Sequence, residues 1–231
     1  MADDSILGEL DRDGALFEAT ERVRGIPGAT TRRGLLGLVA GGTALGLLGG
    51  RAAAHSANAH ADDVSILNYA LALEYLQAAF YTEAERLGAL HGALAQQAAV
   101  VGAHERAHVS ALAHVLGSSA IRRPTFDFRG VTEAPDAFRR TAVAFEDLAV
   151  AAYKDQLPRI QSPAYLQATV EIHSVEARHA AWIRRLAGVL PAATAFDQPL
   201  APKHVNALVR STRFVVAAPQ TSARRGPRFT G

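Results

Sequence analysis

Two Glu-x-x-His pairs carry the most informative spacing in this sequence: Glu105 with His108, and Glu176 with His179. Residues three positions apart lie on neighbouring turns of an α-helix, so the two side chains of each pair can reach one point in space. Each pair lies in a stripe of mostly apolar residues spaced alternately three and four apart, which predicts the buried face of a helix. The stripes are Val101, Glu105, His108, Leu112 and Val115, and Thr169, Ile172, Glu176, His179, Ile183 and Leu186.

Two more glutamates, Glu74 and Glu146, lie in similar stripes without a histidine three positions on. Each is followed seven positions later by a tyrosine, Tyr81 or Tyr153. We expect these tyrosines to be core residues whose hydroxyls touch the glutamates, rather than redox-active groups. The distance along the chain from each lone glutamate to the next Glu-x-x-His pair is nearly equal, so an internal duplication is one interpretation of the pattern.

Together these positions predict a metal site with four carboxylates and two imidazoles: Glu74, Glu105, His108, Glu146, Glu176 and His179. Such ligands suit iron or manganese. Four buried carboxylates would repel one another and cost on the order of several kcal/mol each in desolvation, and two divalent cations remove that penalty. The prediction is therefore a dinuclear site with two Fe or two Mn ions, with positions open for oxygen or peroxide. The alternative is that each buried Glu pairs with an Arg and each buried His bonds a carbonyl.

Five neighbouring residues lie outside this ligand set. His104 should point about 100° away from Glu105 on a helix, and we read His104, His173 and Glu171 as solvated or as contacting a ligand from outside the site. Asp147 is expected to be exposed or to contact a ligand. Trp182 is expected to pack beneath the site.

The composition favours an all-α protein. The chain has 231 residues, 49% of them hydrophobic, and it is rich in alanine and poor in β-branched runs. Two short loops and one long connection, residues 118–134, separate four predicted helices. Two antiparallel hairpins joined by such a crossover make the ferritin-like form of the four-helix bundle. The predicted helices cover about residues 63–86, 93–116, 135–157 and 163–187.

Charge and cysteine content exclude several classes of protein. The formal net charge is +2, and the basic residues are scattered rather than aligned in a stripe, so no nucleic-acid partner is predicted. The sequence has no cysteine, which excludes disulfides and thiolate metal sites. Any metal must be held by Asp, Glu or His.

The segment before the predicted bundle has the pattern of a twin-arginine export signal. Thr31-Arg32-Arg33-Gly34-Leu35-Leu36 precedes an uncharged stretch that reaches Gly50. Small residues at 52–54 and 57–59 are candidate cleavage sites. An uncleaved membrane anchor is the alternative, although residues 34–50 are fewer and richer in glycine than the roughly 20 apolar residues that a spanning helix needs. We therefore expect export across the cytoplasmic membrane, with membrane contact only through an uncleaved signal.

The predicted organisation has three parts. Residues 1–59 form an N-terminal extension with the signal, residues 60–190 the four-helix bundle, and residues 191–231 a C-terminal tail rich in proline and arginine. The middle of this tail is expected to pack along the bundle.

The sequence resembles bacterial ferritin-like proteins that include the desiccation-related proteins. The likeness covers about residues 62 to 200, and its segments are 67–81, 104–109, 124–128, 145–153, 175–182 and 196–200. The resemblance implies a ferritin-like fold with a di-iron or di-manganese centre at the six residues above.

Three functions follow as hypotheses. The first is an exported dinuclear oxidoreductase that oxidises Fe(II) or consumes peroxide, with a role in oxidative or desiccation stress. The second is a non-catalytic stress or structural protein of the cell envelope. The third is iron storage, which needs a closed shell of subunits and fits poorly with the long tail and the export signal. Homo-oligomerisation stays open.

Overall fold

The computed structural model describes the backbone of residues 49–217 and the side chains of residues 62–217. The described residues from His60 onward belong to one compact unit. The predicted twin-arginine segment lies outside the described residues, as does the end of the tail. Within the described part of the chain, no helix combines the length and apolar character needed to cross a membrane.

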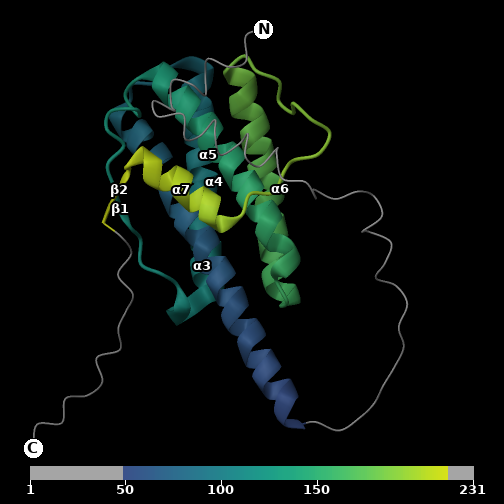
Figure 1. The fold of residues 1–231 in the computed structure, drawn as a ribbon. Helices are drawn as coiled ribbons and strands as arrows, with labels where there is room; N and C mark the ends of the chain where they lie inside the picture. Colours follow the sequence, from purple (N-terminus) through teal and green to yellow (C-terminus); the bar gives the residue numbers. More distant parts are fainter. Residues whose placement is uncertain (1–48, 218–231) are drawn as a thin grey trace, which may run out of the picture. The chain divides into compact units, whose positions relative to one another are not determined.

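Four long helices dominate the described chain (Figure 1): α3 (Gly49–Leu87), α4 (Gly92–Leu116), α5 (Pro135–Gln156) and α6 (Pro163–Leu186). This confirms the prediction of an all-α four-helix bundle. The first helix begins well before the predicted residue 63, whereas the ends of the other three lie within a residue or two of prediction. Gly88 follows α3 with φ +66, a conformation that glycine adopts without steric cost, and the Ser162 hydroxyl caps α6 by accepting from the Tyr165 N–H.

The connections set the bundle topology. Residues 88–91 join α3 to α4, and the 3₁₀ helix η2 (Leu157–Arg159) lies between α5 and α6. Helix α6 packs against both α4 and α5. The long connection between α4 and α5 holds the 3₁₀ helix η1 (Gly117–Ser119) and the short strand β1 (Thr125–Phe126). Two hairpins joined by this crossover are the arrangement expected of a ferritin-like bundle.

The C-terminal tail packs on the bundle through two elements that the sequence pattern did not predict, α7 (Pro202–Thr212) and β2 (Val215–Ala217). Val205 of α7 is fully buried against Leu73 and Ala152. Strand β2 pairs antiparallel with β1, and the ring of Phe214 lies edge-on to that of Phe128. The tail thereby holds the crossover connection against the helices.

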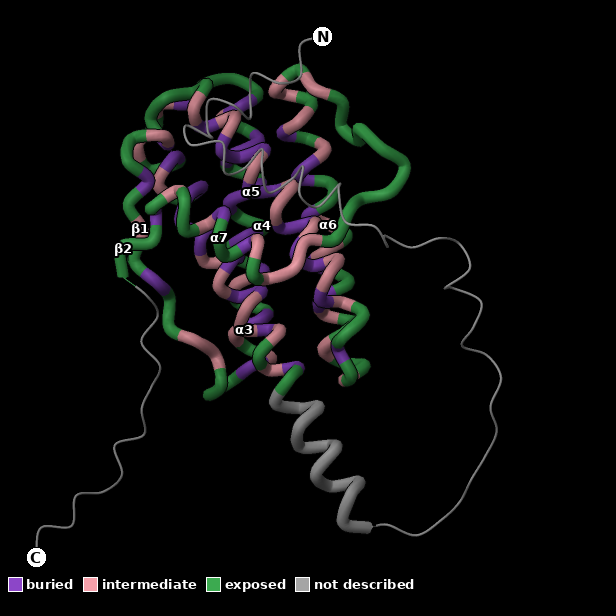
Figure 2. Tube along the Cα trace, in the orientation of Figure 1, coloured by how far each residue is buried: buried purple, intermediate pink, exposed green. Residues whose placement is uncertain are grey.

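Apolar clusters lie on both sides of a polar layer in the bundle. One cluster is centred on Phe80, whose ring stacks on Phe138 at 4.8 Å. The other contains Leu71 and Leu112. Fully burying one such side chain stabilises the fold by about 1.5–3 kcal/mol. Figure 2 shows the buried residues along the helices of the bundle, with exposed residues between them. In each of the four long helices, the residues between the two clusters include a buried glutamate.

Candidate metal centre

The structure brings all six predicted ligand side chains into this polar layer. The four glutamates are 0% exposed, His179 is 2% exposed and His108 is 9% exposed. Helix α3 supplies one glutamate, α5 another, and α4 and α6 each supply a Glu-x-x-His pair. Because the stripes of four helices face the same axis, residues far apart in the sequence meet at one place.

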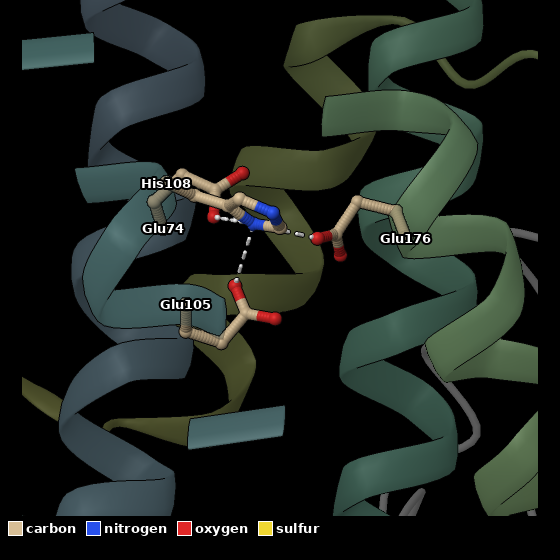
Figure 3. Close-up of side chains that lie close together, drawn as sticks. All are labelled: Glu74, Glu105, His108 and Glu176. Atoms are coloured by element: carbon tan, nitrogen blue, oxygen red, sulfur yellow. Dashed lines mark hydrogen bonds and ion pairs between the residues drawn. The ribbon is translucent and has the colours of Figure 1, made fainter. Parts of the chain in front are cut away.

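One group of ligand atoms surrounds His108 (Figure 3). Its Nδ1 lies 3.3 Å from Glu74 Oε2, 3.5 Å from Glu105 Oε2 and 3.1 Å from Glu176 Oε1. These four residues offer ligand atoms that all lie within 4.8 Å of one another.

A second group surrounds His179 in the same way. Its Nδ1 lies 2.9 Å from Glu105 Oε1, 3.6 Å from Glu146 Oε2 and 3.5 Å from Glu176 Oε1. Glu105 and Glu176 belong to both groups. Glu105 turns Oε2 toward His108 and Oε1 toward His179, so its carboxylate could contribute a ligand atom to each group.

The two tyrosines hold the outer oxygens of the unshared glutamates. The Tyr153 hydroxyl donates to Glu74 Oε1 at 2.6 Å, and the Tyr81 hydroxyl donates to Glu146 Oε1 at 2.6 Å. Each bond runs from one hairpin to the other. Burial raises the pKa of both tyrosines well above the ordinary value, so both stay protonated donors. Each glutamate is thereby left with Oε2 facing an imidazole.

Two other residues contact the ligands from outside the groups. Gln77 Nε2 lies 3.5 Å from Glu176 Oε2, and His104 Nδ1 lies 2.9 Å from His179 Nε2. Gln77 was missed in the sequence, although it lies three residues after Glu74 on the same buried face. His104 is exposed, as its position off the stripe predicts, and also contacts a ligand from outside.

The remaining neighbours are less involved. Trp182 is 39% exposed, so the prediction that it packs beneath the site is wrong. Asp147 forms a 2.6 Å ion pair with Arg184. His173 is half-buried beside the ring of Tyr153, and Glu171 is exposed.

The imidazoles carry strongly raised pKa values. Burial acts to lower the pKa of His108, but the facing carboxylates of Glu105, Glu176 and Glu74 outweigh it and raise the value to about 12. The same opposition raises the pKa of His179 to about 11. Without other cations, protonated imidazoles therefore partly neutralise the carboxylates.

The carboxylates of the site do not all shift in the same direction: the pKa values of Glu146 and Glu105 are raised, and that of Glu176 is lowered. Burial raises the pKa of Glu146 to about 7, although His179 acts to lower it. Burial, with the charges of Glu176 and Glu74, raises the pKa of Glu105 well above its ordinary value. Glu176 is the exception: burial alone would raise its pKa, but the two facing imidazoles lower it to about 2. The site therefore holds protons that a bound metal would have to displace.

Several ligand atoms of the site are placed better to bind a metal ion than to form hydrogen bonds with one another. In the described part of the chain, Glu105 Oε1 and Oε2, Glu146 Oε2, Glu176 Oε1 and His179 Nδ1 are buried without a well-aligned hydrogen-bond partner. Each such atom costs about 1–3 kcal/mol. The 4.8 Å spread within each group accommodates ligands on opposite sides of an ion with bonds of about 2.0–2.2 Å. The residues present therefore fit metal binding.

Comparison with known proteins agrees with this geometry. Residues 62–189 match the ferritin-like domain family. This span begins within α3, before Glu74, and ends just after α6. No curated protein matches the sequence. Since the match covers more than half of the chain, and the helices and buried groups agree with it, this protein belongs to the ferritin-like domain family.

Proposed function

We propose that the protein is an exported ferritin-like protein that holds two iron or two manganese ions and takes part in oxidative or desiccation stress. The observation that carries the metal site is the set of five buried ligand atoms that lack a well-aligned hydrogen-bond partner and lie within the two groups. A structural core with no ligand would leave fewer such atoms unpaired, because buried polar groups in native proteins are nearly all satisfied.

The residues divide into terminal and shared ligands. Glu74 with His108 would hold one ion, and Glu146 with His179 the other, while Glu105 and Glu176 lie between the two positions. Iron or manganese bound here supplies electron transfer to oxygen or peroxide.

The protein itself orients the ligands and keeps bulk water out. Tyr153 and Tyr81 each hold one oxygen of a terminal glutamate and leave the other free for a cation. Gln77 does the same for Glu176. The four glutamates have no exposed surface, so charges at the site interact without screening by bulk water.

Metal analysis tests the proposed site. Protein loaded anaerobically with Fe(II) or Mn(II) and then desalted is expected to retain about two ions per chain. Glu105→Ala should lose most of both, since Glu105 belongs to both groups. Glu171→Ala is the matched control, because it removes an exposed glutamate from α6. Retention below about half an ion per chain would contradict the proposal.

Export is supported by the arginine pair at Arg32 and Arg33, followed by an uncharged stretch. Replacing both arginines by lysine is expected to keep the protein in the cytoplasm, as measured by cell fractionation. Export that continues unchanged would reject the twin-arginine route.

A non-catalytic role in the cell envelope is the second candidate. The raised pKa values of His108 and His179 favour it, because protonated imidazoles partly neutralise the carboxylates without metal. Oxygen and peroxide consumption by metal-loaded protein separates the two functions. Turnover that Glu105→Ala abolishes supports the oxidoreductase, whereas two bound ions without turnover support the non-catalytic protein.

A further inference from the structure

An exposed histidine contacts one of the two imidazole ligands from the surface of the bundle. His104 Nδ1 lies 2.9 Å from His179 Nε2. The planes of the two rings are 19° apart and their centroids 5.2 Å apart, so the rings lie nearly end to end, as a hydrogen bond between ring nitrogens requires. His104 lies on α4 and His179 on α6, so the contact joins two neighbouring helices.

The direction of this hydrogen bond follows from the other nitrogen of His179. Its Nδ1 faces the carboxylates of Glu105, Glu146 and Glu176, which is the metal side. A neutral imidazole that binds a cation through Nδ1 carries its proton on Nε2. His179 Nε2–H must then donate to His104 Nδ1, and His104 keeps its own proton on Nε2. The bond fixes both the tautomer and the ring orientation of His179.

The other imidazole ligand lacks an equivalent partner. The pair Glu105/His108 corresponds in register to Glu176/His179, so the counterpart of His104 is Val175, which offers no acceptor. In the part of the chain with described side chains, the polar contacts of His108 all run through Nδ1. The two halves of the site are therefore alike in ligands and different in what supports them.

We propose that His104 is a positioning residue that makes the metal position of Glu146 and His179 bind its ion more tightly than the position of Glu74 and His108. This rests on the proposed function, in which the site holds two cations. The physical reason is that a hydrogen bond to the remote nitrogen of a histidine ligand raises its basicity and orients its ring, and losing such a bond costs about 10–100-fold in metal affinity.

The test is a Co(II) titration of the metal-free full chain, followed by visible absorption of the bound ion. Wild-type protein is expected to bind two ions in two steps that differ by about 10-fold or more. His104→Ala should weaken the tighter step by about 10–100-fold and leave the other step unchanged. His104→Gln, whose amide oxygen can accept the same hydrogen bond, should recover most of the loss. His114→Ala is the matched control, since His114 is an exposed histidine on the same helix.

A second readout reports the bond itself. In Zn(II)-loaded protein labelled with ¹⁵N-histidine, NMR should show a slowly exchanging proton on His179 Nε2, and His104→Ala should remove that protection. Two bound ions with a His104→Ala titration like that of wild type would overturn the role of His104 and leave the metal site standing. Wild-type protein that takes up no Co(II) would overturn both.

Discussion

Replacing Tyr81 by Phe removes one of the two tyrosine–glutamate hydrogen bonds that cross between the hairpins. Tyr81 and Glu146 are both 0% exposed, and the hydroxyl lies 2.6 Å from the carboxylate. The ring of Phe at this position keeps the edge contacts with Phe80 and Phe138, so the hydroxyl alone is lost. A hydrogen bond to a charged group contributes about 1.5–3 kcal/mol. We therefore expect the unfolding free energy of the metal-free protein to fall by about 2 kcal/mol at about pH 8, or about 4–8 °C in Tm for a chain of this size.

The effect should depend on pH because the acceptor titrates. Burial raises the pKa of Glu146 to about 7, so the carboxylate is mostly ionised at about pH 8 and mostly protonated at about pH 5.5. The bond is then neutral at the lower pH, and the loss in Tyr81→Phe should shrink to about 1 kcal/mol. Urea unfolding followed by circular dichroism at both pH values measures this difference.

Tyr75→Phe is the control on the same helix. The Tyr75 hydroxyl lies 3.5 Å from the Ile121 carbonyl oxygen in a half-buried position, so its removal should cost less than about 0.5 kcal/mol. If Tyr81→Phe lost no more than this control at about pH 8, the crossed hydrogen bonds would not be stabilising the site. An equal loss at both pH values would refute the charged state assigned to Glu146.

Three further predictions concern metal, packing and pH. Metal at 100 times its dissociation constant should stabilise the protein by about 2.7 kcal/mol per site, and a chelator should reverse this gain. An unchanged Tm with metal present would contradict the presence of a metal site. Gly102→Ala should lower the free energy of unfolding by about 1–3 kcal/mol, measured by urea unfolding. The reason is that the new Cβ would lie 2.9 Å from Tyr81 Cβ and would meet the Glu85 side chain. A gain of about 1 kcal/mol, which is usual for this change inside a helix, would show that the helices can separate. In metal-free protein, Tm should fall as the pH rises from about 5 to about 9. The pKa of Glu146 is raised from 4.5 to about 7 and that of His179 from 6.5 to about 11, so the native state binds more protons than the unfolded state over this range. A Tm that rises with pH over this range would contradict these raised pKa values.

The sequence predicts the four-helix bundle and the meeting of its six buried polar groups because both depend on one periodic signal. An apolar stripe at helical spacing identifies the inward face of a helix, and a carboxylate within such a stripe must lie on that same buried face. Gln77 carries the same signal, since it lies between Glu74 and Tyr81 on the inward face. An amide is not a usual ligand for iron or manganese, and its role becomes visible only when Glu176 of a different helix is placed beside it.

Other features depend on neighbours that one helix does not reveal. His104 points away from Glu105 on its own helix, but α6 lies alongside and presents His179 to it. Helix α7 is short, and only two of its residues, Val205 and Leu208, are buried, so its pattern is weak until the bundle surface is known. Strands β1 and β2 form only as a pair, from segments far apart in the sequence. The export signal and the identity of the metal stay predictions.

The two tyrosine–glutamate bonds are also compatible with the interpretation that the chain contains an internal duplication. Tyr81 of α3 serves a glutamate of α5, and Tyr153 of α5 serves a glutamate of α3. Two separate, identical hairpins related by a two-fold axis would make the same pair of bonds across their junction, with no new contact required after gene fusion. If the chain arose in this way, positions where the halves differ, such as His104 against Val175, are those that changed after the two copies were joined.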